Sequence, residues 1–531
     1  MAFYGIGTNP ILRALRIKVP SVKQVWLADD ATGAGKLVPL KQWWLEIAEE
    51  GRRYGYFVKP SKSWLVLKDP TLLEETRNLF ADSPINITIE GKRHLGAAIG
   101  TESFKDEYMQ DKVRKWCNEI KKLTEIAKSQ PHAAYAAFIH GEQHKFTYFM
   151  RTIANISDTL KPLDDAINNT FIPILFGREI TDNEREIISM PIREGGLGLR
   201  AISNNSEQSY HCSSKITRCL VNQIITQSED LPDVETEQKD RREVVTQVKQ
   251  LDSIRSSNIK NRQEFLLQRV LHQASEPGAS SWLGALPIEA QGFNLNKGEF
   301  QDSLRVRYLM QLENLPSMCP CGEKFDLTHA MKCTTGGFIH ARHDNIRDME
   351  FQLLQVVCND VEKEPHLQKV VNKQGYEKSA ITDDDARLDV RARGFWRRGQ
   401  NSFFDVRVTH PNNTSQRNTK LETILKKHED EKKRHYNRRV REVEQGSFTP
   451  LVFTTTGVMS HECTKYHKAL AEKLSEKQGE RYDVIMRYLR VKLSFLAQKA
   501  TLLCLRGSRR GKGNVGEQGE DFGFSLDQLG L

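Results

Sequence analysis

Apolar and polar residues change their spacing several times along this chain of 531 residues. In residues 1–104, short apolar runs typical of strands (VKQVWL, SWLVL and INITIE) alternate with one amphipathic helical pattern over residues 40–55. Residues 105–225 instead carry apolar side chains three and four positions apart, which predicts a bundle of helices. The first part of the chain is therefore expected to contain an α/β unit followed by an all-helical one.

The second half shows a further change of pattern. Residues 226–312 open with an almost entirely charged or polar stretch, SEDLPDVETEQKDRREVVTQVKQ, and are expected to form a linker or an exposed helix. Residues 339–506 carry strand patterns at RLDVRARGF, SFFDVRVTH and TPLVFTTTG around a charged helix over residues 421–445. The stretch RGSRRGKGNVGEQGEDFG is poor in apolar residues, and residues 507–531 are expected to be disordered. The predicted fold class is thus multidomain, α/β plus α.

The amino-acid composition and charge favour some classes of protein over others. The chain has 78 Lys and Arg against 69 Asp and Glu, and the net charge of +9 permits a polyanionic partner without requiring one. The nine cysteines are an odd number and no secretory signal precedes them, so a disulfide framework is not expected. No apolar run reaches the length of a membrane span. We expect a protein of a reducing compartment that is neither secreted nor inserted in a membrane.

Four potential metal ligands fall within one short stretch, CPCGEKFDLTHAMKC. They are Cys319, Cys321, His329 and Cys333, in the order C-x-C-x7-H-x3-C. Thiolates with one imidazole suit the tetrahedral preference of Zn²⁺, although the single residue between the first two cysteines implies a tight turn. The segment CPCGEKFDLTH has too few apolar residues to fold around a core of its own, so the zinc would supply the fold of this small knuckle, residues 313–338. The alternative is a chance cluster of free or buried side chains.

Two adjacent carboxylates, Asp29 and Asp30, follow an apolar run in VWLADDATGAG and precede small, turn-forming residues. The pattern predicts a hairpin whose tip carries both acids. Two-metal phosphoryl transfer needs carboxylates on rigid strands, and such a hairpin would supply one side of a magnesium site. Acids at a turn are also common without any ligand, so a solvated turn is the alternative.

Further motifs accompany this hairpin. Leu27-Ala28-Asp29-Asp30, Lys62 in PSKSWLVLK, the Leu-Gly turn of HLGAAIG and the helical stretch ending in PIREGGLGLRAIS follow one another along the chain. Together they resemble the reverse transcriptases of non-LTR retrotransposons, with leucine in place of the aromatic residue that usually precedes Ala-Asp-Asp. The resemblance implies a partial polymerase palm over residues 1–104, a helical thumb over residues 105–225, and contact between Lys62 and nucleic acid.

The same resemblance implies that the polymerase site is incomplete. The family's palm uses another metal-binding aspartate on an earlier strand, whereas residues 1–28 contain no Asp or Glu. Asp29 and Asp30 would then hold magnesium only in an incomplete site. We expect RNA-directed DNA synthesis only of a longer parent polyprotein, of which this chain would be the C-terminal part, or of a protein that begins upstream of Met1.

A second pair of acids lies beyond the knuckle. Asp389 in ARLDVRARGF and Asp405 in SFFDVRVTHP sit on two predicted strands joined by a glycine-containing turn. Carboxylates on neighbouring strands with a nearby cation can hold Mg²⁺ or Mn²⁺ for hydrolysis of a phosphodiester. Ordinary solvent-facing charges on amphipathic strands are the alternative.

This second pair resembles the PD-(D/E)xK restriction-like endonucleases over residues 339–506. In that comparison Arg407 stands where lysine is usual, and arginine can neutralise charge but hardly serves as a base. Some relatives carry the lysine on a following helix, so Lys432 or Lys433 could take that part, with Tyr436 near the reacting phosphate. On the preceding helix, Arg342, His343 and Arg347 could meet phosphate, and Glu350 could be an auxiliary metal ligand.

The order of the three motif groups is that of non-LTR elements with a restriction-like endonuclease. The resemblance implies nicking of chromosomal DNA so that the new 3′ end primes reverse transcription of the element's RNA. Implied partners are the DNA target and the element RNA, with a possible homodimer on DNA, and the implied location is the nucleus, otherwise the cytoplasm. A non-catalytic remnant or domesticated binding protein is the alternative.

Basic residues provide a separate reason to expect nucleic acid. The predicted helix over residues 426–441 carries cations, among them Arg434 and Arg438, that could follow a phosphate track, although a helix of internal ion pairs fits equally well. Phe395 and Trp396 at a predicted turn could stack on bases or be buried.

Overall fold

The computed structural model describes residues 2–509 apart from 229–233, 372, 374–375 and 377–380. The chain divides into two compact units, each built from three segments. The first comprises residues 1–122, 141–169 and 201–252, and the second comprises residues 123–140, 170–200 and 253–531. The six-part division expected from the sequence stays a prediction, and most of the predicted disordered tail lies outside the described residues.

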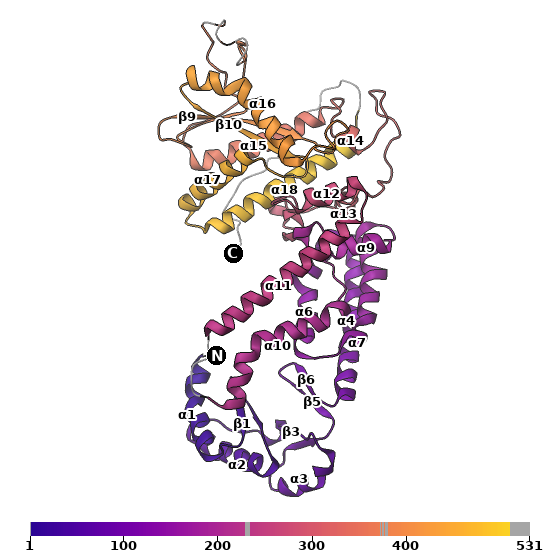
Figure 1. The fold of residues 1–531 in the computed structure, drawn as a ribbon, viewed down its shortest axis with the longest axis vertical. Helices are drawn as coiled ribbons and strands as arrows, with labels where there is room; N and C mark the ends of the chain where they lie inside the picture. Colours follow the sequence, from indigo (N-terminus) through magenta and orange to yellow (C-terminus); the bar gives the residue numbers. More distant parts are fainter. Residues whose placement is uncertain (1, 229–233, 372, 374–375, 377–380, 510–531) are drawn as a thin grey trace. The chain divides into compact units, whose positions relative to one another are not determined.

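The first unit combines small β-hairpins with long helices (Figure 1). The strands β1 and β2 form an antiparallel hairpin, β3 pairs in parallel with β4, and β5 and β6 form a second hairpin. Buried residues of α1 and α2, including Ile11, Leu15 and Trp43, pack into one apolar cluster. The elements are α1 (Ala2–Lys18), β1 (Lys23–Leu27), β2 (Asp30–Ala34), α2 (Leu37–Arg53), β3 (Trp64–Val66), α3 (Leu73–Leu79), β4 (Asn86–Thr88), β5 (Gly91–His94), β6 (Ala97–Gly100), α4 (Glu102–Ala127), α6 (Gln143–Thr152), α7 (Ser157–Ala166), α10 (Ser203–Thr226) and α11 (Val234–Asn261), of which α4 and α11 extend past its limits.

The second unit holds a four-stranded mixed sheet in the order β10-β9-β8-β7. The pairs β7–β8 and β8–β9 are antiparallel, while β9 and β10 run parallel over eight residues, from Ser402 beside Ser447 to Thr409 beside Thr454. The elements are α5 (Pro131–Ala137), α8 (Ile172–Phe176), α9 (Asp182–Ser189), α12 (Phe265–Ser275), α13 (Lys297–Arg307), α14 (Leu327–Ala330), α15 (Phe338–Val357), β7 (Val361–Lys363), β8 (Val390–Arg393), β9 (Asn401–Thr409), α16 (Leu421–Glu442), β10 (Ser447–Thr454), α17 (His461–Gln478) and α18 (Tyr482–Arg506). Short 3₁₀ segments lie at Pro60–Lys62, Pro70–Leu72, Ile192–Glu194, Ser281–Gly284 and Glu289–Gln291, and π-helical turns at Phe138–Glu142 and Ile167–Phe171.

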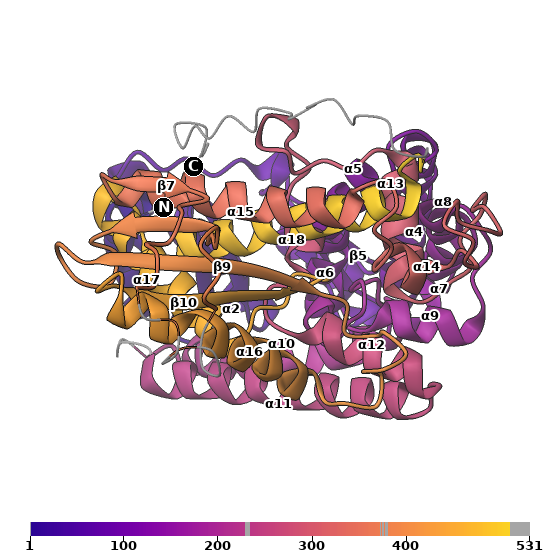
Figure 2. The same cartoon turned by 90° about the horizontal axis from the view of Figure 1, so that it is seen from above.

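Both faces of this sheet are covered by helices (Figure 2). On one face Phe404 and Val406 of β9 pack with α15, α17 and α18. On the other face Phe403, one position earlier on the same strand, packs with Val440 of α16 and Phe448 of β10. Because strand side chains alternate between faces, a strand covered on both sides buries successive residues, and β9 does so from Ser402 to Val406.

The sequence predicted α2, β1, β3, β4, β8, β9, β10 and α16 close to their observed bounds, and residues 234–261 form the exposed helix α11 rather than a linker. The helix α1 was not predicted, and Pro10 lies inside it. Among the described residues, none of the helices has the length and apolar content needed to cross a membrane.

Candidate active site and metal centre

The four predicted zinc ligands converge on one point. The sulfur atoms of Cys319 and Cys333 lie 3.7 Å apart, those of Cys321 and Cys333 3.9 Å apart, and Cys321 Sγ lies 3.4 Å from His329 Nε2. A tetrahedral Zn²⁺ with Zn–S bonds of about 2.3 Å separates its sulfur ligands by about 3.8 Å. The donor set therefore fits zinc in both chemistry and size. Within the described residues, no other group of three or more His, Cys, Asp or Glu side chains is placed to hold one ion.

Local turns bring these ligands together. Cys319 and Cys321 bracket a tight turn in which the N–H of Gly322, at φ +92°, donates to the carbonyl of Cys319. That φ lies in the left-handed region that glycine tolerates best. The following short helix α14 is capped by Asp326, whose carboxylate accepts from the N–H of His329 at 2.7 Å. These contacts fix the ligand positions through the backbone.

The knuckle also shares an apolar core with the rest of its unit. Phe325, Ala330 and Met331 pack with Cys504 and Leu505 at the end of α18. Zinc is therefore not the sole source of stability, in contrast to the expectation from the apolar-poor sequence. All nine cysteines are free of disulfides.

Asp389 and Asp405 lie beside each other on the sheet. Asp389 immediately precedes β8, and its N–H donates to the carbonyl of Phe404 while its Oδ2 accepts from the N–H of Val406. These two contacts bracket Asp405 on the neighbouring strand β9. Asp405 therefore lies on a strand as predicted, whereas Asp389 lies one residue before the observed strand β8; the two strands are adjacent.

Lys432 of α16 points to this pair. Its Nζ lies 2.6 Å from Asp405 Oδ2, but that buried oxygen has no hydrogen-bond partner of adequate geometry. Burial raises the pKa of Asp405 to about 6, the charge of Asp389 adds to this effect, and Lys432 opposes it. A buried carboxylate beside a second carboxylate suits a divalent cation with oxygen ligands.

The two candidate lysines have different partners. Lys433 forms an ion pair with Glu462 of α17 at 3.0 Å, whereas Lys432 reaches Asp405. Tyr436, one helical turn after Lys432, is half-buried, and burial together with the charges of Asp405 and Asp389 raises its pKa to about 12. The phenol therefore stays protonated and is a hydrogen-bond donor at neutral pH.

His343 joins the site from α15. Its Nε2 lies 3.3 Å from Asp389 Oδ2 and 3.2 Å from the carbonyl oxygen of Val406. Burial alone would lower the pKa of His343, but the hydrogen bond to Asp389 and the charges of Asp389 and Asp344 outweigh it, so this pKa is raised.

Arg407 is exposed on β9, two positions after Asp405. Its charge reaches α16, because it contributes, after burial, to the lowered pKa of His428. Arg407 is thus an available cation on the strand that carries Asp405.

Two arginines that were predicted to meet phosphate are engaged with other parts of the protein. Arg342 is 6% exposed and donates to the carbonyl of Met331 in the knuckle, and Arg347 is 8% exposed and pairs with Asp344, Asp348 and Glu364. The expectation that these two arginines meet phosphate is wrong, because both guanidinium groups are buried and engaged within the protein.

Glu350 is likewise excluded as a metal ligand at this site. It is 0% exposed, and its Oε1 lies 3.0 Å from Nε2 of the buried His467. Phe395 is 1% exposed and Trp396 donates to the hydroxyl of Thr449, so these aromatic residues are part of the packing.

On α16, Arg434 is exposed, while Arg438 pairs with Glu442 at 3.2 Å and lies over the ring of Tyr376 at 4.6 Å. The helix therefore combines an exposed cation with an internal ion pair.

Arg439 of α16 is a buried structural residue that the sequence did not single out. It is 0% exposed and donates to the carbonyls of Gln368, Ile381 and Asp383. These bonds fasten both ends of the segment that leads to Asp389. Its spacing from Lys432 and Tyr436, seven and three residues, is the signal that could have placed it on the same helical face.

The first unit carries the other predicted acids. Asp29 lies in the two-residue turn between β1 and β2, next to Ala28 at φ +56°, and Asp30 begins β2. Both acids are exposed, as is Lys62. The predicted hairpin tip is confirmed.

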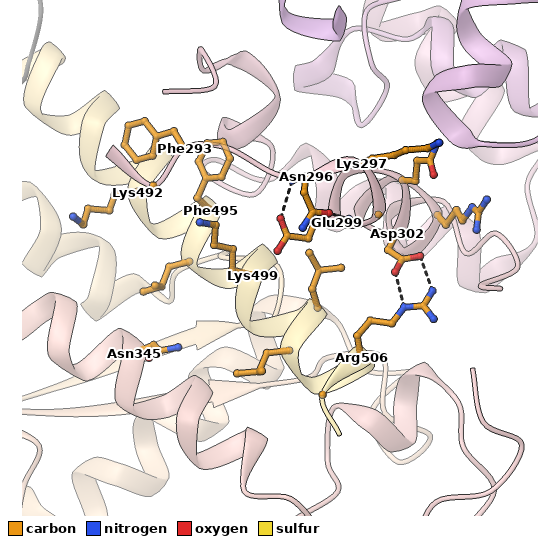
Figure 3. A pocket seen from close by; sticks show the side chains of 18 of the residues that line it. Phe293, Asn296, Lys297, Glu299, Asp302, Asn345, Lys492, Phe495, Lys499 and Arg506 are labelled. Carbon is orange, nitrogen blue, oxygen red and sulfur yellow. Dashed lines mark hydrogen bonds and ion pairs between the residues drawn. The ribbon is translucent and has the colours of Figure 1, made fainter. Parts of the chain in front are cut away.

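A separate groove of about 1450 Å³ lies among α13, α15 and α18 (Figure 3). Its acids are engaged: Asp302 pairs with Arg506 at 2.6 Å, Glu313 with Arg305 at 3.1 Å, and Glu299 caps α13. The groove therefore offers no free carboxylate pair comparable to Asp389 and Asp405.

Comparisons with models of protein families and with curated proteins gave no match to this chain.

Proposed function

We propose that residues 338–506 form a metal-dependent endonuclease that hydrolyses phosphodiester bonds in DNA. The observation that carries this proposal is the convergence of Asp389, Asp405 and Lys432, from a strand end, a strand and a helix, at the buried carboxylate of Asp405, whose Oδ2 lies 2.6 Å from Lys432 Nζ. Mg²⁺ or Mn²⁺ held there would activate water and stabilise the charge that develops on the phosphate oxygens.

The protein residues have distinct parts in this reaction. Asp389 and Asp405 would hold the cation, and Asp405 would have to be ionised to do so, which its pKa of about 6 allows at neutral pH. Lys432 keeps Asp405 charged and donates toward the scissile phosphate. Tyr436, protonated at neutral pH because its pKa is about 12, can donate a hydrogen bond to the same phosphate but cannot serve as the base. Arg407 neutralises phosphate charge at the rim.

The zinc knuckle supports this arrangement mechanically. It packs on the end of α18, and Arg342 of α15 donates to its Met331 carbonyl at 3.2 Å. Since α15 also carries His343, loss of zinc should disturb the position of that residue as well as the knuckle itself.

We further propose that the chain derives from a non-LTR retrotransposon polyprotein. Support comes from the ordered motifs: the Asp29-Asp30 hairpin, the zinc knuckle and the carboxylate pair. The corresponding partners are a DNA target and the element RNA, and the corresponding location is the nucleus. Asp29 and Asp30 have no third carboxylate close enough to share an ion within the described residues, so DNA synthesis by this chain alone is not proposed.

The test is nicking of supercoiled plasmid with Mg²⁺ or Mn²⁺ by zinc-loaded protein. Wild type should produce nicked circles, and an Asp389→Ala/Asp405→Ala double variant should produce none. Asp483→Ala, which changes an exposed acid paired with Arg481, serves as the control and should cleave as wild type does. If none of the three proteins nicks the plasmid but all retain DNA or RNA binding in a filter assay, the result would favour a non-catalytic binding protein.

A further inference from the structure

The turn between β8 and β9 is held against the sheet by its two aromatic residues. Phe395 is 1% exposed, and its ring centre lies 5.4 Å from that of Phe404 and 5.1 Å from that of Tyr466. The indole N–H of Trp396 donates to the hydroxyl of Thr449 at 3.0 Å. Because both aromatic side chains are engaged in packing, the turn has a fixed position on its scaffold.

The two arginines that follow, Arg397 and Arg398, are exposed on this fixed turn. Lysines of α17 lie around the same aromatic residues. Nζ of Lys465 is 6.0 Å from the centre of the indole ring of the turn, and Nζ of Lys473 is 5.8 Å from the centre of its phenyl ring. We name the cations of the turn and the helix the basic turn surface, which consists of Arg393, Arg397, Arg398, Lys465, Lys468, Lys473 and Lys477.

The cations of the basic turn surface are not neutralised by acids of the protein. Among the residues that the structure describes, none of them forms an ion pair, whereas Arg391, on the same strand β8, pairs with Asp360 and Glu362, both at 3.1 Å. Helix α17 also carries the exposed acids Glu472 and Glu476, which are fewer than the cations. Like charges repel one another, so this surface is complementary to a polyanion that neutralises several cations together.

The distance of this surface from the carboxylate pair suits duplex DNA. Asn401, the first residue of β9, precedes Asp405 by four residues, which at about 3.3 Å per residue is about 13 Å, and the turn lies beyond Asn401. Half a helical turn of B-DNA spans about 17 Å. A duplex with one phosphate at the carboxylate pair can therefore bring phosphates about half a turn away to the basic turn surface.

We propose that the basic turn surface binds the sugar-phosphate backbone of duplex DNA beside the point of cleavage. It contributes affinity rather than sequence selectivity, because contacts to phosphate carry no direct information about the base sequence. The inference rests on the proposed nuclease function for the position of the scissile phosphate, and it adds a binding surface outside the carboxylate pair.

The experiment measures binding of zinc-loaded full-length protein to a fluorescent duplex of about 30 base pairs, by anisotropy over a range of KCl concentrations and without Mg²⁺ or Mn²⁺. Arg397→Gln/Arg398→Gln/Lys465→Gln should bind about 10–100-fold more weakly at physiological salt. The slope of log affinity against log salt should become shallower by about 2–3, since each lost phosphate contact removes about 0.9. Arg398→Gln alone should remove about 0.9 from the slope, and Arg397→Lys/Arg398→Lys, which keeps both charges, should keep the slope of wild type.

A control with the same loss of charge separates this surface from net charge. Arg77→Gln/Lys161→Gln/Arg262→Gln removes three cations that lie outside the surface and already have acidic partners in the protein. This control should bind the duplex as wild type does. Melting temperatures of all variants identify any folding defect.

The outcomes separate the inference from the function on which it rests. An affinity and a salt slope of the triple turn variant equal to those of wild type would overturn the inference. So would an equal loss in the charge control, or a loss of affinity for single-stranded RNA with affinity for the duplex unchanged. In the plasmid assay, nicking by the triple turn variant should fall at limiting protein and recover at excess protein, and nicking that stays lost at excess protein would contradict a role in binding. If no protein nicks but duplex binding changes as expected, the nuclease function is overturned and the DNA-binding surface stands.

Discussion

The ionisation of Asp405 can be tested directly, because burial disfavours the charged carboxylate that the proposed function requires. Burial raises the pKa of Asp405 from its ordinary 3.8 to about 6. A tenfold change in acidity is worth about 1.4 kcal/mol, so ionised Asp405 costs the fold about 3 kcal/mol. Because the folded-state pKa is the higher one, the folded protein binds more protons than the unfolded chain between pH 3.8 and about 6. Stability should therefore fall as pH rises through this window.

Asp405→Asn keeps the shape of the side chain and removes its ionisation. At pH 8, without Mg²⁺ or Mn²⁺, the variant should be more stable than wild type by about 3 kcal/mol, and the difference should shrink toward zero near pH 4. Lys432, whose side chain is 20% exposed, can be hydrated once its partner is neutral.

The assay is urea denaturation of both proteins, monitored by far-UV circular dichroism, in zinc-loaded form and in buffer freed of other divalent ions. Added Mn²⁺ should stabilise wild type by mass action and have little effect on the variant. A variant no more stable than wild type at pH 8, or a gap that is the same at pH 4.5 and 8, would refute this account of Asp405.

Three further changes test other parts of the structure. Cys321→Ser should lower the zinc content found by elemental analysis and destabilise the second unit. Cys219→Ser, which changes a cysteine outside the cluster, should leave the zinc bound. Equal zinc content in the two variants would argue against the zinc site. Glu350→Ala should lower the free energy of unfolding by about 3–5 kcal/mol, because the buried His467 loses its partner. Glu350→Gln should keep the Mn²⁺ affinity of wild type in calorimetry. A weaker Mn²⁺ affinity of this second variant would show that Glu350 is a metal ligand. Arg439→Lys should reduce both nicking rate and melting temperature, since an ammonium group cannot reproduce the guanidinium fork; unchanged values would show that the carbonyls it binds need no such anchor.

Local pattern was sufficient to predict much of the second unit. The alternation in SFFDVRVTH gave β9 and placed Asp405 on it, and the ligand spacing gave the thiolate cluster. Both signals operate over a few residues, so nothing about the distant chain is needed to recognise them.

What could not be predicted depends on contacts between distant segments. The choice between Lys432 and Lys433 follows from how α16 is rotated over the sheet, which the helix sequence does not encode by itself. The burial of Arg342 and Arg347 involves Met331 in the knuckle and Glu364, which lies beyond α15. Both arginines therefore resemble surface cations in the sequence.

The missed helix α1 has a local cause. Pro10 lies at its centre, and proline in a helix interior usually argues against the helix. Buried contacts of Ile11 and Leu15 with α2 outweigh that cost in the structure.

The most direct measurement compares single-turnover nicking of supercoiled plasmid by wild type, Lys432→Ala and Lys433→Ala with saturating Mn²⁺. These lysines are adjacent on α16, but only the first contacts Asp405, while the second pairs with Glu462. The account predicts cleavage reduced at least about 100-fold by Lys432→Ala, as for loss of a group that stabilises developing charge, and cleavage close to wild type for Lys433→Ala. Equal activity of the two variants, or loss confined to Lys433→Ala, would contradict the proposed site.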